Sequence, residues 1–241
     1  MAGHSKWANI KHRKDKADKQ KGKLFSRFAK EIISAVKVGG ADPESNPRLR
    51  LAIQKARAAN FPADNIERNI KKGSSSATEN FEMVTYEIYG LGGVGLFIEA
   101  MTDNKNRTAT DMRIATNKRG GTITTPGAVA FNFDRKGVIQ IAKKKAIEEE
   151  KILDAALQAG AEDVDITDEG FMIVTDQSAL YAVKEKLDQM GFTSEEAEIV
   201  MIPKNTISCT EEAKKANLAL IEWIEDLDDV NAVYHNMELN E

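Results

Sequence analysis

The series of strand-like and helix-like patterns between residues 138 and 202 constrains the fold more than any other part of the chain. Short β-prone runs alternate there with stretches of helical periodicity, in the order strand, helix, strand, strand, helix, strand. This is the βαββαβ order of a ferredoxin-like module. We expect strands at 138–141, 163–167, 171–175 and 197–202, and helices at about 146–159 and 178–190.

The last segment, residues 205–241, is too short to fold alone. It shows a helical pattern at about 210–227 and a strand pattern at 232–237. The apolar stripe of this helix would be exposed if the segment protruded. We therefore expect the segment to complete a similar α/β module begun by residues 80–135, with the βαββαβ unit inserted between the two parts. Three consecutive domains with a protruding tail are the alternative.

Residues 83–89 and 94–101 are β-prone runs separated by a glycine-rich turn, and they predict a hairpin. A dinucleotide-binding loop is disfavoured, because the glycines have the wrong spacing and lead into a strand instead of opening a helix. A helical pattern follows at about 107–118. The Gly- and Pro-containing segment 122–130 then leads towards the inserted unit, and we expect it to matter for activity but not for folding.

Residues 21–75 show the patterns of three short helices. Apolar residues at four-residue steps over about 21–38 predict the first helix. The Asn–Pro pair at 46–47 suits the start of the second helix, and residues from about 62 to 72 form the third. We expect a small helical bundle, followed by a polar linker at 74–80.

These patterns together predict an α+β fold, with a small helical N-terminal domain plus two α/β ferredoxin-like modules, one inserted into the other. The expected domains are residues 1–75, residues 80–135 together with 204–241, and the inserted unit 136–203. The single Cys209 excludes an intramolecular disulfide and a Cys-rich zinc cluster, and it is typical of a reducing compartment.

The charge of the chain is divided unequally along its length. The whole chain has 34 Lys and Arg against 38 Asp and Glu, but residues 1–75 hold 18 against 7 and the remainder holds 16 against 31. Such asymmetry indicates contact with nucleic acid or with a membrane. No apolar run approaches the roughly 18 residues of a membrane span, and the first residues lack the pattern of a signal or transit peptide. We expect a cytoplasmic protein that binds nucleic acid.

The stretch from Lys6 to Lys23 places eight Lys and Arg against two Asp, and residues 1–20 are called the basic arm below. Trp7 suits stacking on an unpaired base as well as it suits burial against the first helix, and both alternatives stay open. The arginines suit bidentate phosphate contacts and the lysines supply point charge. The candidate nucleic-acid-binding residues are Lys6, Trp7, Lys11, His12, Arg13, Lys14, Lys16, Lys19, Lys23, Arg27, Arg48 and Arg57.

Four segments of the chain closely resemble the YebC/PmpR family. They are the opening GHSKWANIKHRK, the stretch GGADPESNPRLRLAIQKARAANFPADNIERNIKKG, the hairpin GGVGLFIEAMTDNKNRT and the segment GAVAFNFDRKGVI. The resemblance covers essentially the whole chain and implies a helical N-terminal domain with two α/β domains. It places Lys6 to Lys14 within the opening motif of the family. Ile88 and Leu91 depart from the family pattern, which has Gly and Pro there, and Asn132 stands where Met is common.

The resemblance also implies control of gene expression through nucleic acid, with no known catalysis. Family members have been described as DNA-binding transcriptional regulators, and the family includes mitochondrial translational activators and bacterial factors that act on ribosomes stalled at proline-rich sequences. DNA and ribosomal RNA, including the ribosome itself, therefore both remain expected partners.

The residues alone show no convincing recognition helix and mildly favour RNA, whereas the family descriptions favour DNA, so both targets stay open. A DNA regulator needs a recognition helix, for which Arg48, Gln54 and Arg57 are the nearest candidates. A ribosome-binding translation factor needs only complementarity of shape and charge to folded RNA. A nuclease is disfavoured, because Glu99, Asp103 and Asp111 do not make a two-metal site. We expect a monomer with no catalytic residue, metal, cofactor, membrane contact or small-molecule substrate.

Overall fold

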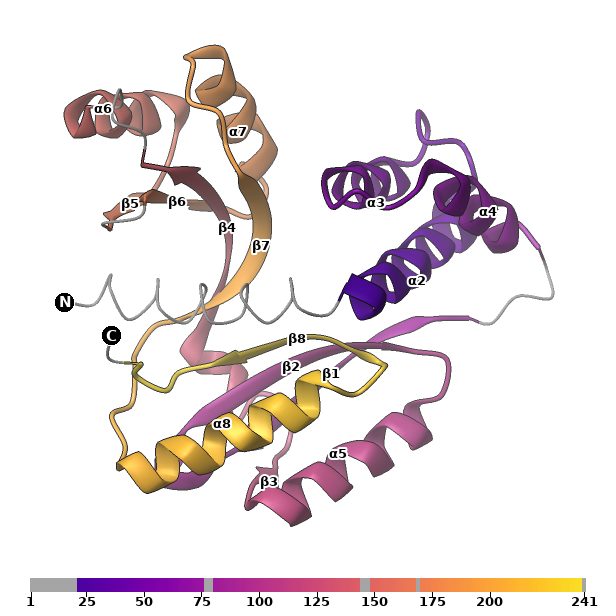
Figure 1. Ribbon diagram of the computed structural model, residues 1–241, viewed down its shortest axis with the longest axis vertical. Helices are drawn as coiled ribbons and strands as arrows, with labels where there is room; N and C mark the ends of the chain where they lie inside the picture. Colours follow the sequence, from indigo (N-terminus) through magenta and orange to yellow (C-terminus); the bar gives the residue numbers. More distant parts are fainter. Residues whose placement is uncertain (1–20, 76–79, 144–147, 168–169, 240–241) are drawn as a thin grey trace. The chain divides into compact units, whose positions relative to one another are not determined.

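The computed structural model of the chain describes residues 21–75, 80–143, 148–167 and 170–239 (Figure 1). Within these residues the fold is mixed α+β, with a helical region and two four-stranded sheets, which confirms the predicted fold class. The described residues divide into two units. The first unit consists of 21–128 with 209–233, and the second consists of 129–208 with 234–239. The division into three domains stays a prediction.

The helical region consists of α2 (Lys21–Gly39), α3 (Pro47–Ala58) and α4 (Ala63–Gly73). Asn46 caps α3, since its side chain accepts a hydrogen bond from the backbone N of Leu49 at 3.1 Å. Pro47 follows at the first helical position, where its missing N–H costs nothing. The predicted second helix therefore begins where the Asn–Pro pair places it.

The core of the helical region lies between α2, α3, α4 and the loop before α4. Phe61 packs edge-on against Phe25, with ring centroids 5.0 Å apart. Burial of this apolar surface stabilises the three helices, which would be only marginally stable in isolation. The buried residues of this core are Ile32, Ala35, Val36, Leu49, Ala52, Ile53, Ala56, Phe61 and Ile66.

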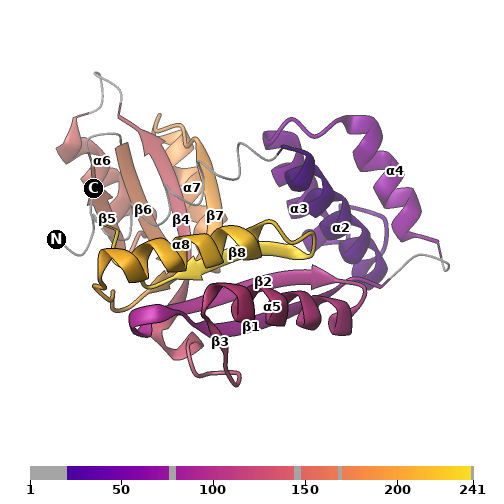
Figure 2. The same ribbon diagram turned by 60° about the horizontal axis from the view of Figure 1, so that its bottom comes forward.

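The first sheet has the strand order β3-β1-β2-β8. The C-terminal strand β8 therefore lies beside β2, as the interrupted module predicts. Figure 2 shows α5 and α8 side by side over one face of this sheet. The elements are β1 (Glu82–Tyr89), η1 (Leu91–Gly93), β2 (Gly95–Thr102), α5 (Lys105–Arg119), β3 (Thr122–Ile123), α8 (Glu211–Glu225) and β8 (Val230–His235).

The second sheet has the strand order β5-β6-β4-β7, with the three neighbouring pairs antiparallel. This order and the succession of elements make it ferredoxin-like. Helices α6 and α7 pack on the sheet through a core that includes Ile141, Ile152 and Phe171. The elements are η2 (Ala130–Asn132), β4 (Phe133–Ala142), α6 (Glu149–Ala159), β5 (Asp163–Ile166), β6 (Gly170–Asp176), α7 (Leu180–Gln189) and β7 (Glu196–Pro203).

Strand β4 begins at Phe133, five residues before the predicted start of the strand at 138. The segment Asp134 to Lys136 reads as a polar turn in the sequence, but its backbone pairs with β7, with Asp134 opposite Ile202. The side chains of Asp134 and Arg135 are exposed. The predicted start was wrong. Residues 134–136 lack an apolar alternation because exposed side chains stand there, although their backbone belongs to the strand.

Among the helices in the described ranges, none is both long enough and apolar enough to span a membrane.

Candidate nucleic-acid interface

The structure describes four of the twelve candidate nucleic-acid-binding residues. Lys23 and Arg27 lie on α2, and Arg48 and Arg57 lie on α3. The other eight lie outside the described residues, so their place in the site stays a prediction. They are Lys6, Trp7, Lys11, His12, Arg13, Lys14, Lys16 and Lys19.

Two basic residues of α3 are turned towards α2. The Nη2 atom of Arg48 donates to Oγ of Ser34 at 3.0 Å. The Nζ atom of Lys55 lies 3.8 Å from Oε1 of Glu31. Arg48 and Lys55 are seven residues apart, two helical turns, so they share one side of α3. Part of the positive charge of α3 is thus used to hold the helical region together.

Two other arginines of α3 face the solvent. Arg50 and Arg57 are also seven residues apart, and Gln54 lies between them on the same side of the helix. All three side chains are exposed. Among the residues that the structure describes, Arg50 has one long ion pair, to the exposed Glu44 at 3.9 Å, which contributes little. We call Arg50, Gln54 and Arg57 the α3 stripe.

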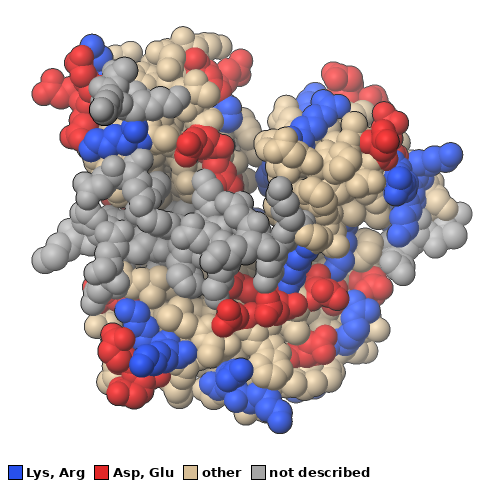
Figure 3. All heavy atoms as spheres, viewed as in Figure 1, with Lys and Arg blue, Asp and Glu red and all other residues tan. Residues whose placement is uncertain are grey.

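The last turns of α4 add a second exposed group of cations. Arg68, Lys71 and Lys72 are three and four residues apart and therefore neighbours on the helix surface. Lys71 and Lys72 also lie at the negative end of the helix dipole, which favours positive charge. Figure 3 shows Lys and Arg side chains over α3 and α4, together with acidic ones. Residues 21–75 hold twelve Lys and Arg against five Asp and Glu.

Lys23, in contrast, points towards the end of α8. Its ammonium donates a hydrogen bond to the backbone carbonyl of Glu225. Burial lowers the pKa of Lys23 to about 8; the positive charge of Arg27 acts in the same direction, and the carboxylates of Asp226 and Asp228 oppose the shift. Lys23 is therefore still mostly charged at neutral pH, but its ammonium is already engaged within the protein.

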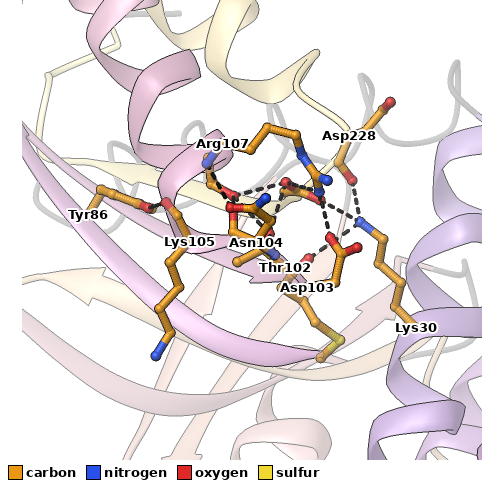
Figure 4. A network of polar contacts seen from close by, with 11 residues as sticks. Lys30, Tyr86, Thr102, Asp103, Asn104, Lys105, Arg107 and Asp228 are labelled. Atoms are coloured by element: carbon orange, nitrogen blue, oxygen red, sulfur yellow. Dashed lines mark hydrogen bonds and ion pairs between the residues drawn. The ribbon is translucent and has the colours of Figure 1, made fainter. Parts of the chain in front are cut away.

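Lys30 contacts the turn between α8 and β8, in the same region of the fold. Its Nζ atom lies 2.9 Å from Oδ1 of Asp229 and 3.0 Å from the carbonyl oxygen of Asp228 (Figure 4). A longer hydrogen bond of 3.3 Å reaches the carbonyl of Met101. Lys30 therefore connects α2 with the edge of the first sheet.

Asp229 is the centre of this polar network. Its side chain accepts hydrogen bonds from Nη2 of Arg107 at 2.9 Å, from Oγ1 of Thr108 at 2.9 Å and from Oγ1 of Thr102 at 3.1 Å. Burial alone would raise the pKa of Asp229, but the hydrogen bonds from Lys30, Arg107 and Thr108 outweigh it and lower the pKa to about 2. The carboxylate is therefore ionised and structural at neutral pH.

The start of α5 positions two of these partners. Asn104 caps the helix, since its side chain accepts from the backbone N of Arg107 at 3.1 Å. The backbone N of Asn104 in turn donates to Oγ1 of Thr102 at 2.9 Å (Figure 4). No sequence pattern predicted this network, although the segment TDNKNRT that supplies most of its residues lies in a motif of the family resemblance.

The carboxylates considered for a nuclease are arranged differently from a metal site. Oδ1 of Asp103 accepts from Nη2 of Arg107 at 2.7 Å, and this positive charge beside it disfavours a bound cation. In the part of the chain that the structure describes, no group of three or more His, Cys, Asp and Glu could hold a metal ion.

The fold and the site define a class of protein: two α/β modules with a basic helical region whose exposed cations face the solvent. The chain belongs to the TACO1/YebC family. Residues 5–76 match the N-terminal domain of the TACO1/YebC protein, and residues 81–237 match the TACO1/YebC second and third domain.

The sequences of relatives match this chain over nearly their whole lengths. The chain is 65% identical to a "Probable transcriptional regulatory protein" of Protochlamydia amoebophila, covering 100% of this chain and 98% of that protein. It is 58% identical to a protein of the same description from Chlamydia pneumoniae, covering 98% and 100%. The crystal structure of a conserved hypothetical protein from Aquifex aeolicus is 45% identical, with a TM-score of 0.85, covering 98% of this chain and 97% of that one.

Proposed function

We propose that this protein is a regulator of gene expression that binds nucleic acid through the basic arm and the exposed cations of the helical region. The observation that carries the proposal is the division of charge on α3. Arg48 and Lys55 are used in contacts with α2, whereas Arg50 and Arg57 face the solvent with Gln54 between them. A bundle that needed arginine only for its stability would not require this second, exposed stripe.

Duplex DNA is the target that the α3 stripe supports first. The major groove of DNA admits an α-helix, arginine pairs with guanine through two hydrogen bonds, and glutamine does the same with adenine. Arg50 and Arg57 lie about 10 Å apart along the helix axis, which is seven residues at about 1.5 Å each. The relatives named as transcriptional regulators point to the same target.

Ribosomal RNA is the second candidate, and the α4 group favours it. Arg68, Lys71 and Lys72 provide charge, and the amide of Asn69 beside them donates to the carbonyl of Asn65 at 2.7 Å within the helix. Folded RNA is recognised largely by shape and by contacts to phosphates. A translation factor that binds the ribosome would use these cations as well as the α3 stripe.

A competition experiment separates the two targets. Labelled full-length protein is offered large ribosomal subunits and an excess of promoter-length duplex DNA at physiological salt. A preference for one duplex over scrambled duplexes, reduced in the double variant Arg50→Gln with Arg57→Gln, supports a transcriptional regulator. Retention on the subunits despite the excess of duplex supports a translation factor. Binding to neither target overturns the proposed function.

We further propose that this regulation takes place in the cytoplasm, by a monomer and without catalysis. The Asp103 carboxylate accepts a hydrogen bond from Arg107 at 2.7 Å. Glu99 lies on β2 and Asp111 lies on α5. In the described ranges, no group of three or more His, Cys, Asp and Glu could hold a metal ion. Incubation of the protein with RNA and DNA and added magnesium should give no cleavage. Cleavage that disappears in Asp103→Ala would contradict this part of the proposal.

A further inference from the structure

Phe131 is a large apolar side chain that faces the solvent. It lies in η2, directly before strand β4, and 69% of its surface is exposed. The other described phenylalanines are buried or half-buried, including Phe133 two positions further on. A single exposed apolar residue is common in proteins, so the exposure alone assigns no role to Phe131. Its surroundings decide what the ring can do.

The backbone that carries Phe131 is fixed by the residues that follow β7, the neighbour of β4 in the second sheet (Figure 1). The carbonyl oxygen of Phe131 accepts a hydrogen bond from Nζ of Lys204 at 2.9 Å. The carbonyl of Asn132 accepts from the backbone N of Lys204 at 2.8 Å, and Nδ2 of Asn132 donates to the carbonyl of Asn205 at 3.1 Å. All these residues belong to the second unit of the fold. The ring therefore stands on a rigid support, which loses little conformational entropy when a partner binds.

The charges of this unit are distributed unevenly around Phe131. Residues 129–208 hold nine Lys and Arg against sixteen Asp and Glu, so most of this segment repels a phosphate backbone. Three of the nine cations lie where β4 begins and β7 ends, beside the single carboxylate of Asp134; they are Arg135, Lys136 and Lys204. The start of β7, at the opposite end of the ladder, carries two glutamates instead. Phe131 thus lies at the basic end of an otherwise acidic module.

Lys204 and Arg135 suit contacts with phosphates. Both side chains are exposed. The ion pair of Lys204 with Asp134, at 3.3 Å, is also exposed, with 46% and 51% of the two side chains accessible, and contributes little. A phosphate can therefore replace Asp134 as the partner of Lys204 at small cost.

The combination of an exposed aromatic ring with nearby cations is typical of sites for single-stranded nucleic acid. A base stacks on the ring through its π-face, and the cations contact the adjoining phosphates. Folded RNA offers such bases in its loops and ends, whereas the bases of duplex DNA stay stacked within the helix. A protein partner is disfavoured, because anchor residues of protein interfaces lie within apolar patches. The residues beside Phe131 in the ladder are the polar Asn132, Lys204 and Asn205.

We propose that Phe131 is a stacking platform for an unpaired base of RNA, with Lys204 and Arg135 contacting the phosphates on either side of that base. The inference rests on the proposed function in its second form, binding to ribosomal RNA, and it specifies an unpaired base as part of the target. The site consists of residues of the second unit alone, whereas the α3 stripe belongs to the first unit.

Photo-crosslinking of the full-length protein locates the contact. The probe is a short single-stranded RNA of uridines in which some positions carry 5-iodouridine. Light joins this base to an aromatic side chain that lies against it, and mass spectrometry identifies the joined residue. We expect a link to Phe131 that unlabelled RNA of the same sequence competes away. RNA that binds but becomes linked only to other residues would overturn the proposal.

Three substitutions at Phe131 separate stacking from other uses of an exposed apolar side chain. Phe131→Ala should weaken binding of the RNA roughly fivefold or more, and Phe131→Trp, which keeps an aromatic face, should retain the wild-type affinity. Phe131→Leu keeps an apolar side chain without a π-face and should weaken binding as much as Phe131→Ala does. Wild-type affinity in Phe131→Leu would mean that the ring acts through apolar contact alone, and would overturn the stacking.

Leu157→Ala is the matched control for these variants. Leu157 lies on α6 of the same unit and is 75% exposed, so its removal takes away a comparable exposed apolar side chain. This variant should bind the RNA like the wild type, and all four variants should keep the wild-type Tm because the replaced side chains are exposed. Equal weakening in Leu157→Ala and Phe131→Ala would overturn a specific role for Phe131.

The salt dependence of binding tests the phosphate contacts. Lys204→Gln should lower the magnitude of the slope of log affinity against log salt by about 0.7, the value for one phosphate of a single strand. Phe131→Ala removes no charge and should lower the affinity without changing the slope. Loss of Lys204 as a purely structural support would not change the slope either, so an unchanged slope in Lys204→Gln would contradict the phosphate contact.

Failure of the stacking and failure of the proposed function give different results. A protein that binds RNA or duplex DNA with unchanged affinity in Phe131→Ala, and without a link to Phe131, would retain the proposed function and overturn the stacking. A protein that binds neither RNA nor duplex DNA would overturn the proposed function, and the stacking with it.

Discussion

The Nζ atom of Lys30 lies 2.9 Å from Oδ1 of Asp229, a residue 199 positions further along the chain. This contact joins the basic helix α2 to the turn between α8 and β8. Both side chains are mostly buried, with 17% and 7% of their surfaces exposed, so the pair is screened less than a surface ion pair. The helical region is therefore held to the first sheet by a specific charge pair within one unit of the fold.

Replacing Asp229 tests the strength of this network. Asp229→Asn removes the charge that Lys30 and Arg107 contact while keeping the shape of the side chain. We expect a loss of about 2 kcal/mol in the free energy of unfolding at pH 7, measured with urea. Glu82→Gln, which breaks the exposed pair with Lys105, is the control and should cost less than about 1 kcal/mol. Equal costs would contradict a structural role for Asp229.

The stability contributed by Asp229 should depend on pH. Its pKa is lowered from 3.8 to about 2 in the folded protein, so the unfolded state binds the proton more readily. The contribution is present above the unfolded pKa and is lost as the pH falls from about 4 towards 2. The stability difference between wild type and Asp229→Asn should therefore shrink across this window. A constant difference would show that the carboxylate's charge is not what stabilises the fold.

Asn217 should be essential for the tip of the first hairpin. It is 1% exposed, its Oδ1 accepts from the backbone N of Leu91 at 2.8 Å, and its Nδ2 donates to the carbonyl of Leu91 at 2.9 Å. Asn217→Ala should lower the free energy of unfolding by about 2 kcal/mol, because two backbone groups lose their partner. The exposed Asn117→Ala on α5 should change it by less than about 0.5 kcal/mol. A neutral Asn217→Ala would refute the role of this clamp.

The segment 122–130 should affect activity without affecting folding. It is anchored on both sides: the backbone N of Thr124 donates to the carbonyl of Glu87 at 2.8 Å. On the other side, the backbone N of Gly127 donates to Oε1 of Glu87 and the hydroxyl of Tyr89 donates to the carbonyl of Ala128, both at 2.6 Å. Thr125 and Pro126 between these anchors are exposed. Thr125→Ala with Pro126→Ala should leave the Tm unchanged and reduce regulation in a strain that depends on this protein. Full activity of the double variant would contradict the expectation.

Lys23 should contribute less to nucleic-acid binding than Arg57. Its ammonium is already bonded to the carbonyl of Glu225, whereas Arg57 is exposed on the α3 stripe. Arg57→Gln should weaken binding to duplex DNA or ribosomal RNA by ~threefold or more, and Lys23→Gln by less, in fluorescence anisotropy at one salt concentration. A larger effect of Lys23→Gln would mean that the bond to Glu225 opens when nucleic acid binds.

The order of the elements was predictable because each has its own periodicity and its own end signals. The βαββαβ series and the Asn46 cap are of this kind. The true start of β4 at Phe133 was not predictable, because an exposed strand segment that pairs through its backbone shows no apolar alternation in the sequence. The apolar stripe of α8 supported the one long-range prediction, that the C-terminal segment completes the module begun by residues 80–135. A helix face with Ile221 and Ile224 has to be buried against another element.

The candidate site was predictable only in its composition. Helical spacing groups Arg50 with Arg57 and Arg48 with Lys55, but it does not say which pair faces α2. The hydrogen bond from Arg48 to Ser34 decides that question, and it depends on how two helices pack. The contact of Lys30 with Asp229 has no local signal at all, because both residues look like ordinary surface charges in the sequence.

The salt dependence of binding tests the central claim most directly. For duplex DNA, the slope of the logarithm of affinity against the logarithm of salt concentration has a magnitude of about 0.9 for each phosphate that the protein neutralises. Arg50→Gln with Arg57→Gln should lower the magnitude of this slope by about 2, whereas Arg113→Gln with Lys118→Gln, which removes the same charge from exposed positions on α5, should leave it unchanged. An unchanged slope in the α3 variant, or an equal decrease in both variants, would contradict an interface built on α3.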